Sequence, residues 1–128
     1  MELKKIVHVD DDEDIRTIVQ IAIETVGEMG LVQFPNGAAA LQGIRNTDPD
    51  MFVFDVMMPE MTGQKLREEI GKIPGYEHVP TVYVTAKAED SFTKQLRSEG
   101  ALAVITKPFD PMTLADTLRE IWRDHHNA

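Results

Sequence analysis

The chain has 128 residues, 42% hydrophobic and 27% charged, which fits one globular domain with a single core. Its net charge of −9 argues against direct binding of nucleic acid, because phosphate backbones are bound by clustered basic residues. The absence of cysteine excludes disulfides and thiolate chemistry, and with neither a signal peptide nor a bilayer-spanning apolar run in view we expect a cytoplasmic protein.

The chain opens with a short strand, an acidic run and a helix. The strand is predicted at 6–9 and contains His8, to which we assign no role because no other metal-ligand residue lies at a suitable spacing. Five acidic residues follow at 10–14. Apolar residues then recur at helical spacing from 15 to 26, and this pattern places Arg16 on the side that faces away from the core.

The rest of the chain repeats the order of strand and helix. Strands are predicted at 31–34, 51–55, 79–84 and 103–105, and helices at 38–44, 63–73, 88–99 and 114–122, with a polar tail at 125–128. We expect Trp122 to be a core residue. Five repeats of strand and helix predict an α/β fold, a doubly wound (βα)5 arrangement with a five-stranded parallel sheet and helices on both faces.

The acidic run at 10–14 holds more charge than a helix end requires. Carboxylates are favoured near a helix N-terminus, which accounts for one or two of the five. The others repel one another, and a bound cation would relieve that repulsion.

Polar side chains follow four of the predicted strands, namely Asp10 and Asp11, Asp55, Thr85 and Lys107. Because the carboxyl ends of parallel strands open on one edge of the sheet, we expect these residues to meet in one crevice. Carboxylates bind Mg2+, and an aspartate can attack phosphorus to form an aspartyl phosphate. A lysine can neutralise the charge of a phosphoryl group, and a hydroxyl can donate a hydrogen bond to one of its oxygens.

These residues resemble the motifs of the receiver domain of two-component response regulators, in particular the single-domain chemotaxis regulators. The matching segments are Val9-Asp10-Asp11, Phe54-Asp55-Val56-Met57-Met58-Pro59, Thr85-Ala86 and Lys107-Pro108-Phe109. The resemblance covers essentially the whole chain. It implies one receiver domain over 1–128 with a flavodoxin-like topology.

The resemblance also implies a role for each acidic residue. Asp55 is the phosphoacceptor. Mg2+, or Mn2+, is bound directly by Asp11 and Asp55, through water by Asp10, and by the backbone carbonyl of Met57.

Two further residues are implied to act on the phosphoryl group. Lys107 pairs with it and Thr85 senses it, while the peptide bond from Lys107 to Pro108 is expected to be cis. One position departs from the family, because Val104 stands where a rotating Tyr or Phe is common. We therefore expect the surface of the fourth helix, fifth strand and fifth helix to respond through backbone shifts.

A receiver of this kind takes its phosphoryl group from a sensor histidine kinase or a phosphotransfer protein. It is not an enzyme acting on an external substrate, because it catalyses only its own phosphorylation and autodephosphorylation. The output is a changed surface for a downstream protein target, without direct contact to nucleic acid or membrane. The sequence leaves open the identity of that target, a monomeric or phosphorylation-dependent dimeric state, and a stand-alone chain or part of a longer protein.

Two other functions share parts of the pattern. A haloacid-dehalogenase-like phosphatase would use Asp10 as nucleophile, but its signature wants Thr or Val where Asp14 stands, and it wants a late acidic pair. A flavin-binding domain would hold phosphate on the loop that here is acidic.

Overall fold

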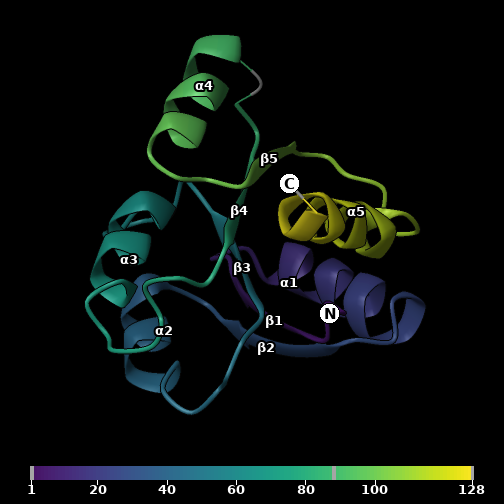
Figure 1. The fold of residues 1–128 in the computed structure, drawn as a ribbon, viewed down its shortest axis with the longest axis horizontal. Helices are drawn as coiled ribbons and strands as arrows, with labels where there is room; N and C mark the ends of the chain where they lie inside the picture. Colours follow the sequence, from purple (N-terminus) through teal and green to yellow (C-terminus); the bar gives the residue numbers. More distant parts are fainter. Residues whose placement is uncertain (1, 88, 128) are drawn as a thin grey trace.

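The computed structural model describes residues 2–87 and 89–127. Its centre is a sheet of five parallel strands in the order β2-β1-β3-β4-β5, so the chain crosses over after β2 and winds in both directions (Figure 1). The strands are β1 (Lys5–Val9), β2 (Gly30–Phe34), β3 (Met51–Asp55), β4 (Thr81–Thr85) and β5 (Ala103–Thr106). The predicted five-stranded, doubly wound sheet is confirmed, with strand ends shifted by one or two residues.

Helices cover both faces of this sheet. They are α1 (Glu13–Gln20), α2 (Gly37–Gly43), α3 (Gly63–Ile70), α4 (Asp90–Ser98) and α5 (Leu114–Asn127), with a π-helical turn η1 (Ile21–Val26) continuing α1. In Figure 1, α1 and α5 lie on one face, α2 and α3 on the other, and α4 stands beyond the β5 edge. No helix in the described part of the chain is both long and apolar enough to cross a membrane.

The first, third and last helices differ from the sequence prediction, and the third does so because it ends at Ile70 instead of at residue 73. The first is not one uniform α-helix, because a five-residue hydrogen bond from Gly27 N to Ala22 O (3.0 Å) widens its last turn. That turn places Gly27 so close to Ala115 of α5 that a side chain would collide there. The predicted start of the fourth helix at Ala88 lies outside the described residues. The last helix continues to Asn127 where a polar tail was predicted, since polar residues do not end a helix whose inner face still packs.

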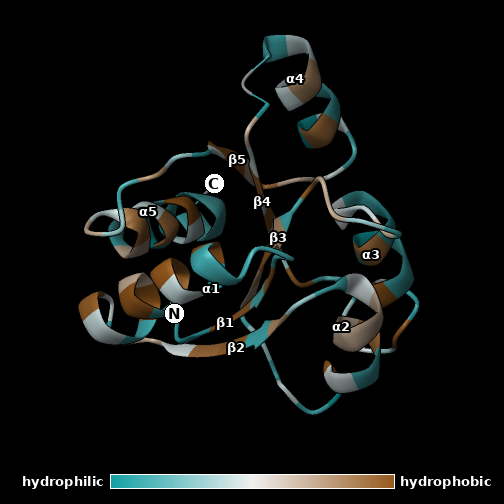
Figure 2. Cartoon of the chain, turned by 180° about the vertical axis from the view of Figure 1, so that it is seen from behind, coloured by the Kyte–Doolittle hydropathy of each residue, from teal (hydrophilic) through white to brown (hydrophobic). Residues whose placement is uncertain are grey.

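Two apolar cores lie on the two sides of the sheet (Figure 2). One is formed under α1 and α5 and includes Trp122, which is buried as predicted. The other lies under α2 and α3 and includes Phe52 and Phe54. Every residue of β3 is buried, because alternate side chains of this central strand enter the two cores. The site residue at the end of β3 is therefore held by the best-packed strand.

The fourth helix buries few of its side chains. Leu96 is its one buried residue among those described, as the thin apolar face predicted, and Phe92 is only half-buried. The neighbouring strand β5 is likewise half-buried. The α4–β5 edge thus has little burial to hold it in one position.

Candidate functional site

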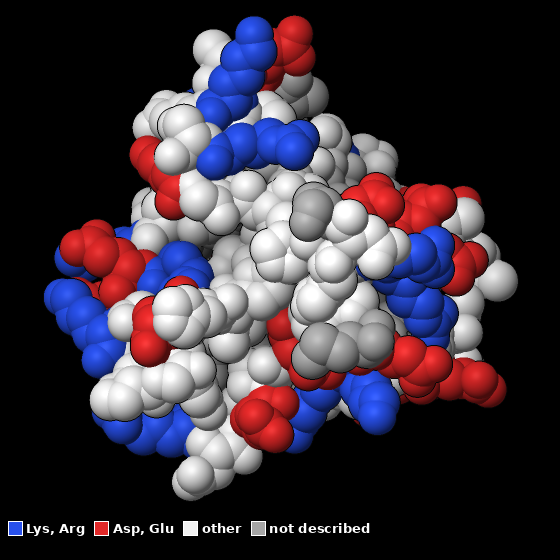
Figure 3. All heavy atoms as spheres, viewed as in Figure 1, with Lys and Arg blue, Asp and Glu red and all other residues white. Residues whose placement is uncertain are grey.

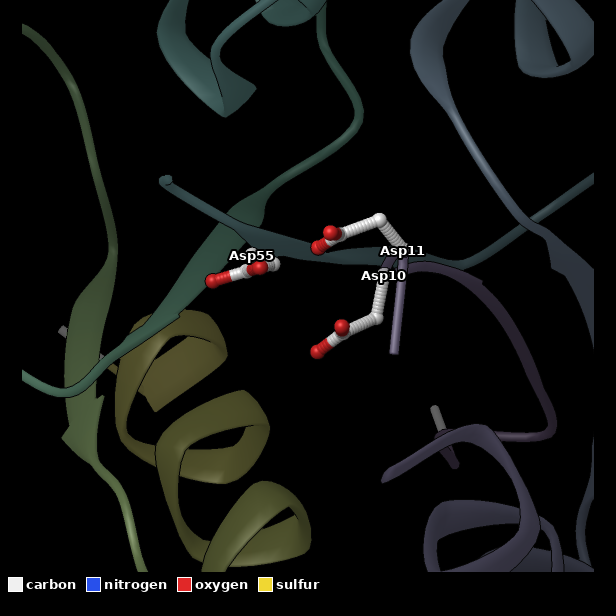
Figure 4. Close-up of side chains that lie close together, drawn as sticks. All are labelled: Asp10, Asp11 and Asp55. Carbon is white, nitrogen blue, oxygen red and sulfur yellow. The ribbon is translucent and has the colours of Figure 1, made fainter. Parts of the chain in front are cut away.

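Three carboxylates from two strand ends converge at the carboxyl edge of the sheet. Asp10 and Asp11 follow β1, and Asp55 is the last residue of the neighbouring strand β3. Each offers an oxygen within 4.8 Å of the other two, and Figure 4 shows the three side chains close together, with those of Asp10 and Asp11 extending to the side on which Asp55 lies. The structure thus brings together the three acids that the sequence selected.

Hydrogen bonds fix the carboxylate, the amide and the carbonyl of Asp10. Its buried carboxylate accepts hydrogen bonds from the Asp12 amide (2.9 Å) and from Lys107 Nζ (2.9 Å). Its own amide donates to Phe34 O (3.3 Å), and its carbonyl accepts from Arg16 Nη1 (2.8 Å). With both carboxylate oxygens engaged, Asp10 suits an indirect role toward a cation, whereas the exposed Asp11 carboxylate is open to one.

Asp55 is the acid whose ionisation the fold disfavours. Burial, together with the nearby charge of Asp10, raises its pKa to about 6, although Lys107 Nζ lies 3.4 Å from Oδ1 and opposes the shift. Burial by itself would lower the pKa of Lys107, but Asp10 and Asp55 outweigh it and raise that pKa. One ammonium is therefore shared by two carboxylates, and negative charge remains in excess.

The chain approaches Asp55 closely at the start of α3. Thr62 caps this helix by accepting from Lys65 N (3.1 Å), and Gly63 N donates to Val56 O (3.0 Å). A Cβ at Gly63 would collide with the carbonyl oxygen of Asp55, so only glycine fits. Sequence reasoning did not single out Gly63, because the contact joins two segments eight residues apart.

Thr85 and Met57 lie at this same edge. Thr85 is buried at the end of β4, beside β3, and its hydroxyl accepts from Lys87 N at 3.1 Å. The Met57 side chain, two residues after Asp55, is 61% exposed. The Lys107–Pro108 peptide bond is cis, as expected.

Arg16 differs from its sequence interpretation, whereas His8 is the packed strand residue that the sequence favoured. Arg16, expected to face away, is half-buried and donates to the Asp10 carbonyl, because the first turn of α1 overhangs the end of β1. His8, given no role, is buried in β1 and contacts Gln33 Nε2 through Nδ1 at 3.0 Å. Burial lowers the pKa of His8 to about 3, with Lys107 and Arg16 adding to the shift, so the ring is neutral.

The donor set fits a hard divalent cation. Three carboxylates share one crevice, and magnesium prefers a few carboxylates completed by water and phosphate oxygens. Asp11 forms no ion pair with any described residue, so its charge is free to face a cation. Burial, and after it the charge of Asp10, raises the pKa of Asp55 to about 6 in spite of Lys107, so a further cation would favour the ionised carboxylate.

A doubly wound sheet with an acidic cluster and a lysine at its carboxyl edge defines a phosphoryl-transfer class of α/β domain. Residues 6–119 match the family model described as the response regulator receiver domain, and the chain belongs to that family. Members of this family act in phosphorylation-controlled signalling of two-component systems. The match does not favour the phosphatase alternative.

Individual relatives agree with this assignment. The chain is 34% identical over 106 residues to an uncharacterised 14.6 kDa protein of Leptolyngbya boryana, covering 83% of this chain and 80% of that protein. It is 33% identical over 128 residues to the transcriptional regulatory protein CseB of Streptomyces avermitilis, covering 99% of this chain and 52% of CseB. The chain thus spans about half the length of that regulator.

Solved structures share the fold. The chemotaxis response regulator CheY4 of Vibrio cholerae superimposes with a TM-score of 0.83 at 27% identity, covering 93% of this chain and 98% of CheY4. A CheY-like receiver domain protein of Methanospirillum hungatei gives a TM-score of 0.80 at 26% identity, covering 98% and 99%.

Proposed function

We propose that Asp55 accepts a phosphoryl group from a phosphohistidine of a sensor kinase or phosphotransfer protein, with residues 1–128 acting as one receiver in the cytoplasm. The observation that carries this proposal is the placement of Asp55. Its carboxylate ends a fully buried strand, lies 3.4 Å from Lys107 Nζ, and shares a crevice with Asp10 and Asp11.

The residues supply the parts of a phosphoryl transfer. A carboxylate oxygen of Asp55 forms the new bond to phosphorus, the bond from phosphorus to the donor nitrogen breaks, and the leaving imidazole keeps the electron pair and takes up a proton. Lys107 neutralises phosphoryl charge, for which it must turn from Asp10 toward the oxygens on Asp55. Thr85 donates its hydroxyl hydrogen to one of these oxygens.

A divalent cation completes the site in this proposal. Asp11 and Asp55 hold Mg2+ or Mn2+ directly, Asp10 holds it through water, and the backbone carbonyl of Met57 is the remaining protein ligand. When bound, the cation neutralises charge on the phosphoryl oxygens. Attack of water on phosphorus later returns the Asp55 carboxylate and inorganic phosphate, so the domain turns over only its own phosphoryl group.

The output of this cycle is a change of surface. Phosphorylation adds charge at Asp55, and α4 and β5, which have little burial to hold them, are elements that such a change can bias. The surface recognises a downstream protein. On the face shown in Figure 3, basic side chains lie among acidic ones instead of gathering into one patch, which does not favour nucleic acid.

Intact mass after incubation with acetyl phosphate tests the proposal. We expect one phosphoryl adduct on the wild type that requires Mg2+ and is absent from Asp55→Asn. The matched control is Asp124→Asn, an exposed acid on α5, which should be labelled like the wild type. An adduct that persists in Asp55→Asn would contradict the proposal, and an adduct mapped to Asp10 would support the phosphatase.

A further inference from the structure

A buried polar contact joins two strands beneath the acidic edge. His8 of β1 and Gln33 of the adjacent strand β2 are paired in register. Gln33 Nε2 lies 3.0 Å from His8 Nδ1, and because the buried ring is neutral, this nitrogen accepts a hydrogen bond. A central strand tolerates a buried imidazole only when such bonds replace those lost from water.

The same amide nitrogen also holds the first helix. Gln33 Nε2 donates to the carbonyl of Arg16 at 2.9 Å, which fixes α1 against β2. From the other end of that residue, Arg16 Nη1 donates to the carbonyl of Asp10 at 2.8 Å. A chain of three hydrogen bonds therefore leaves β1 at His8, passes through β2 and α1, and ends at Asp10, the residue directly after β1.

The chain of bonds ends on the peptide group from which Asp11 projects. The amide and both carboxylate oxygens of Asp10 already have partners in Phe34, Asp12 and Lys107. The Asp11 carboxylate has no hydrogen bond or ion pair with any described residue, so backbone geometry sets its direction. The bond from Arg16 fixes the plane of the peptide between the two aspartates.

We propose that Arg16, held in place by Gln33 and His8, is a positioning residue that aims the Asp11 carboxylate at Asp55 for metal binding. This inference rests on the proposed function, which places the cation between those two acids. Arg16 touches neither carboxylate in this proposal. It acts through the backbone of Asp10.

Charge alone predicts the opposite effect, which makes the inference testable. Arg16 is a cation near a cation site, so by Coulomb's law its removal should strengthen Mg2+ binding. Loss of positioning should weaken it, and residues that orient metal ligands typically change affinity roughly tenfold or more when replaced.

The experiment is isothermal titration calorimetry of the metal-free full chain with Mg2+, without phosphodonor. We expect Arg16→Met to bind Mg2+ roughly tenfold more weakly, and the uncharged change Gln33→Leu to weaken binding in the same direction. The matched control is Arg123→Met, which removes an equal charge from an exposed position on α5 and should leave affinity near that of the wild type.

Equal or tighter binding by Arg16→Met would overturn the inference, as would unchanged binding by Gln33→Leu. If Arg16→Met fails to fold, judged by circular dichroism, Arg16→Lys replaces it. This variant keeps the charge but loses the guanidinium fork, and an affinity equal to that of the wild type would also overturn the inference. Absence of Mg2+ binding by the wild type would instead refute the proposed metal site and the inference with it.

Discussion

At the scale of single residues, the negative charge of the acidic side chains in the site is not fully neutralised. Lys107 pairs at 2.9 Å with Asp10 and at 3.4 Å with Asp55, so one positive charge serves two buried carboxylates. Lys107 lies farther from Asp55 than from Asp10. The pKa of Asp55 is raised to about 6. The proposed phosphoacceptor is therefore a residue whose negative charge the metal-free fold disfavours.

Asp55→Asn should stabilise the metal-free protein in a pH-dependent way. Below pH 3.8 the carboxyl is protonated in both folded and unfolded chains, so wild type and variant differ little. Between 3.8 and about 6 the unfolded chain loses its proton first, and the wild type loses stability as pH rises. At pH 7.5 we expect the variant to be more stable by up to about 3 kcal/mol.

Urea unfolding in the presence of a chelator, repeated at pH 4.5 and pH 7.5, measures this difference. The Asp124→Asn control should show none at either pH. A difference that grows as pH falls would mean that the shift of the Asp55 pKa has the wrong sign.

Lys107→Met should destabilise the fold at pH 7.5. The side chain of Asp10 is 1% exposed, and removing its ammonium partner leaves a buried charge uncompensated, which costs about 3 kcal/mol in comparable cases. Adding Asp10→Asn to this variant should recover much of the loss, since the neutral amide has a smaller desolvation cost. Lys94→Met on the exposed surface of α4 is the control. Thermal unfolding of the wild type, Lys107→Met, the double variant and Lys94→Met measures these differences. No recovery of stability in the double variant would contradict this account.

At the scale of elements, the site depends on how closely α3 approaches the end of β3. Gly63 begins α3, and its Cα faces the carbonyl of Asp55 with no room for a methyl group. The Cε1 atom of the Tyr83 ring lies 3.3 Å from the place that this methyl group would occupy. Sheet and helix are thus in direct backbone contact at Asp55.

Gly63→Ala should therefore cost about 2 kcal/mol and displace Asp55, because overpacking against backbone has no flexible side chain to yield. Gly71→Ala, at the other end of α3, meets its nearest atom at 3.3 Å, the end of the flexible Arg67 side chain, and should change stability by less than about 1 kcal/mol. Chemical denaturation measures both variants. Equal effects in the two glycines would show that helix propensity, not the approach to Asp55, sets the cost.

The elements themselves were largely predictable, for an identifiable reason. Strand runs and helical spacing are local patterns, and their strict alternation leaves a doubly wound parallel sheet as the fold. The π-turn η1 was not predictable, because it depends on Gly27 packing against Ala115 from the far end of the chain. The close approach of Gly63 to Asp55 was not predictable for the same reason, because it too joins separate segments of the chain.

At the scale of the whole molecule, topology explains why the acids could be grouped from sequence. Parallel strands place all their carboxyl ends on one edge, so Asp10, Asp11 and Asp55 had to meet once the order of elements was known. The hydrogen bond from Arg16 to the Asp10 carbonyl could not be predicted from the topology. Helical spacing separates inward from outward residues, but it does not reveal that the first turn of α1 overhangs a strand end.

In the proposed function, a signal from Asp55 reaches the partner surface without a rotating aromatic residue at position 104, where this chain has Val104. The structure offers another route. Thr85 Oγ1 accepts from Lys87 N, Lys87 Nζ lies 5.1 Å from the centre of the Phe92 ring, and Phe92 of α4 packs in the same cluster as Val104. When Thr85 turns toward a phosphoryl oxygen, its bond to Lys87 weakens and the contact with α4 changes.

We therefore expect Phe92→Leu to uncouple α4 from the site while Val104→Ala does not. The measurement is the backbone amide chemical-shift change on adding Mg2+ and beryllofluoride, a phosphoryl mimic. In the wild type and in Val104→Ala, changes should extend from Thr85 into α4. In Phe92→Leu they should stop before α4, because leucine has no ring face for the ammonium, while the changes at Asp55 persist. Changes in α4 that vanish in Val104→Ala but survive in Phe92→Leu would assign the coupling to position 104 after all.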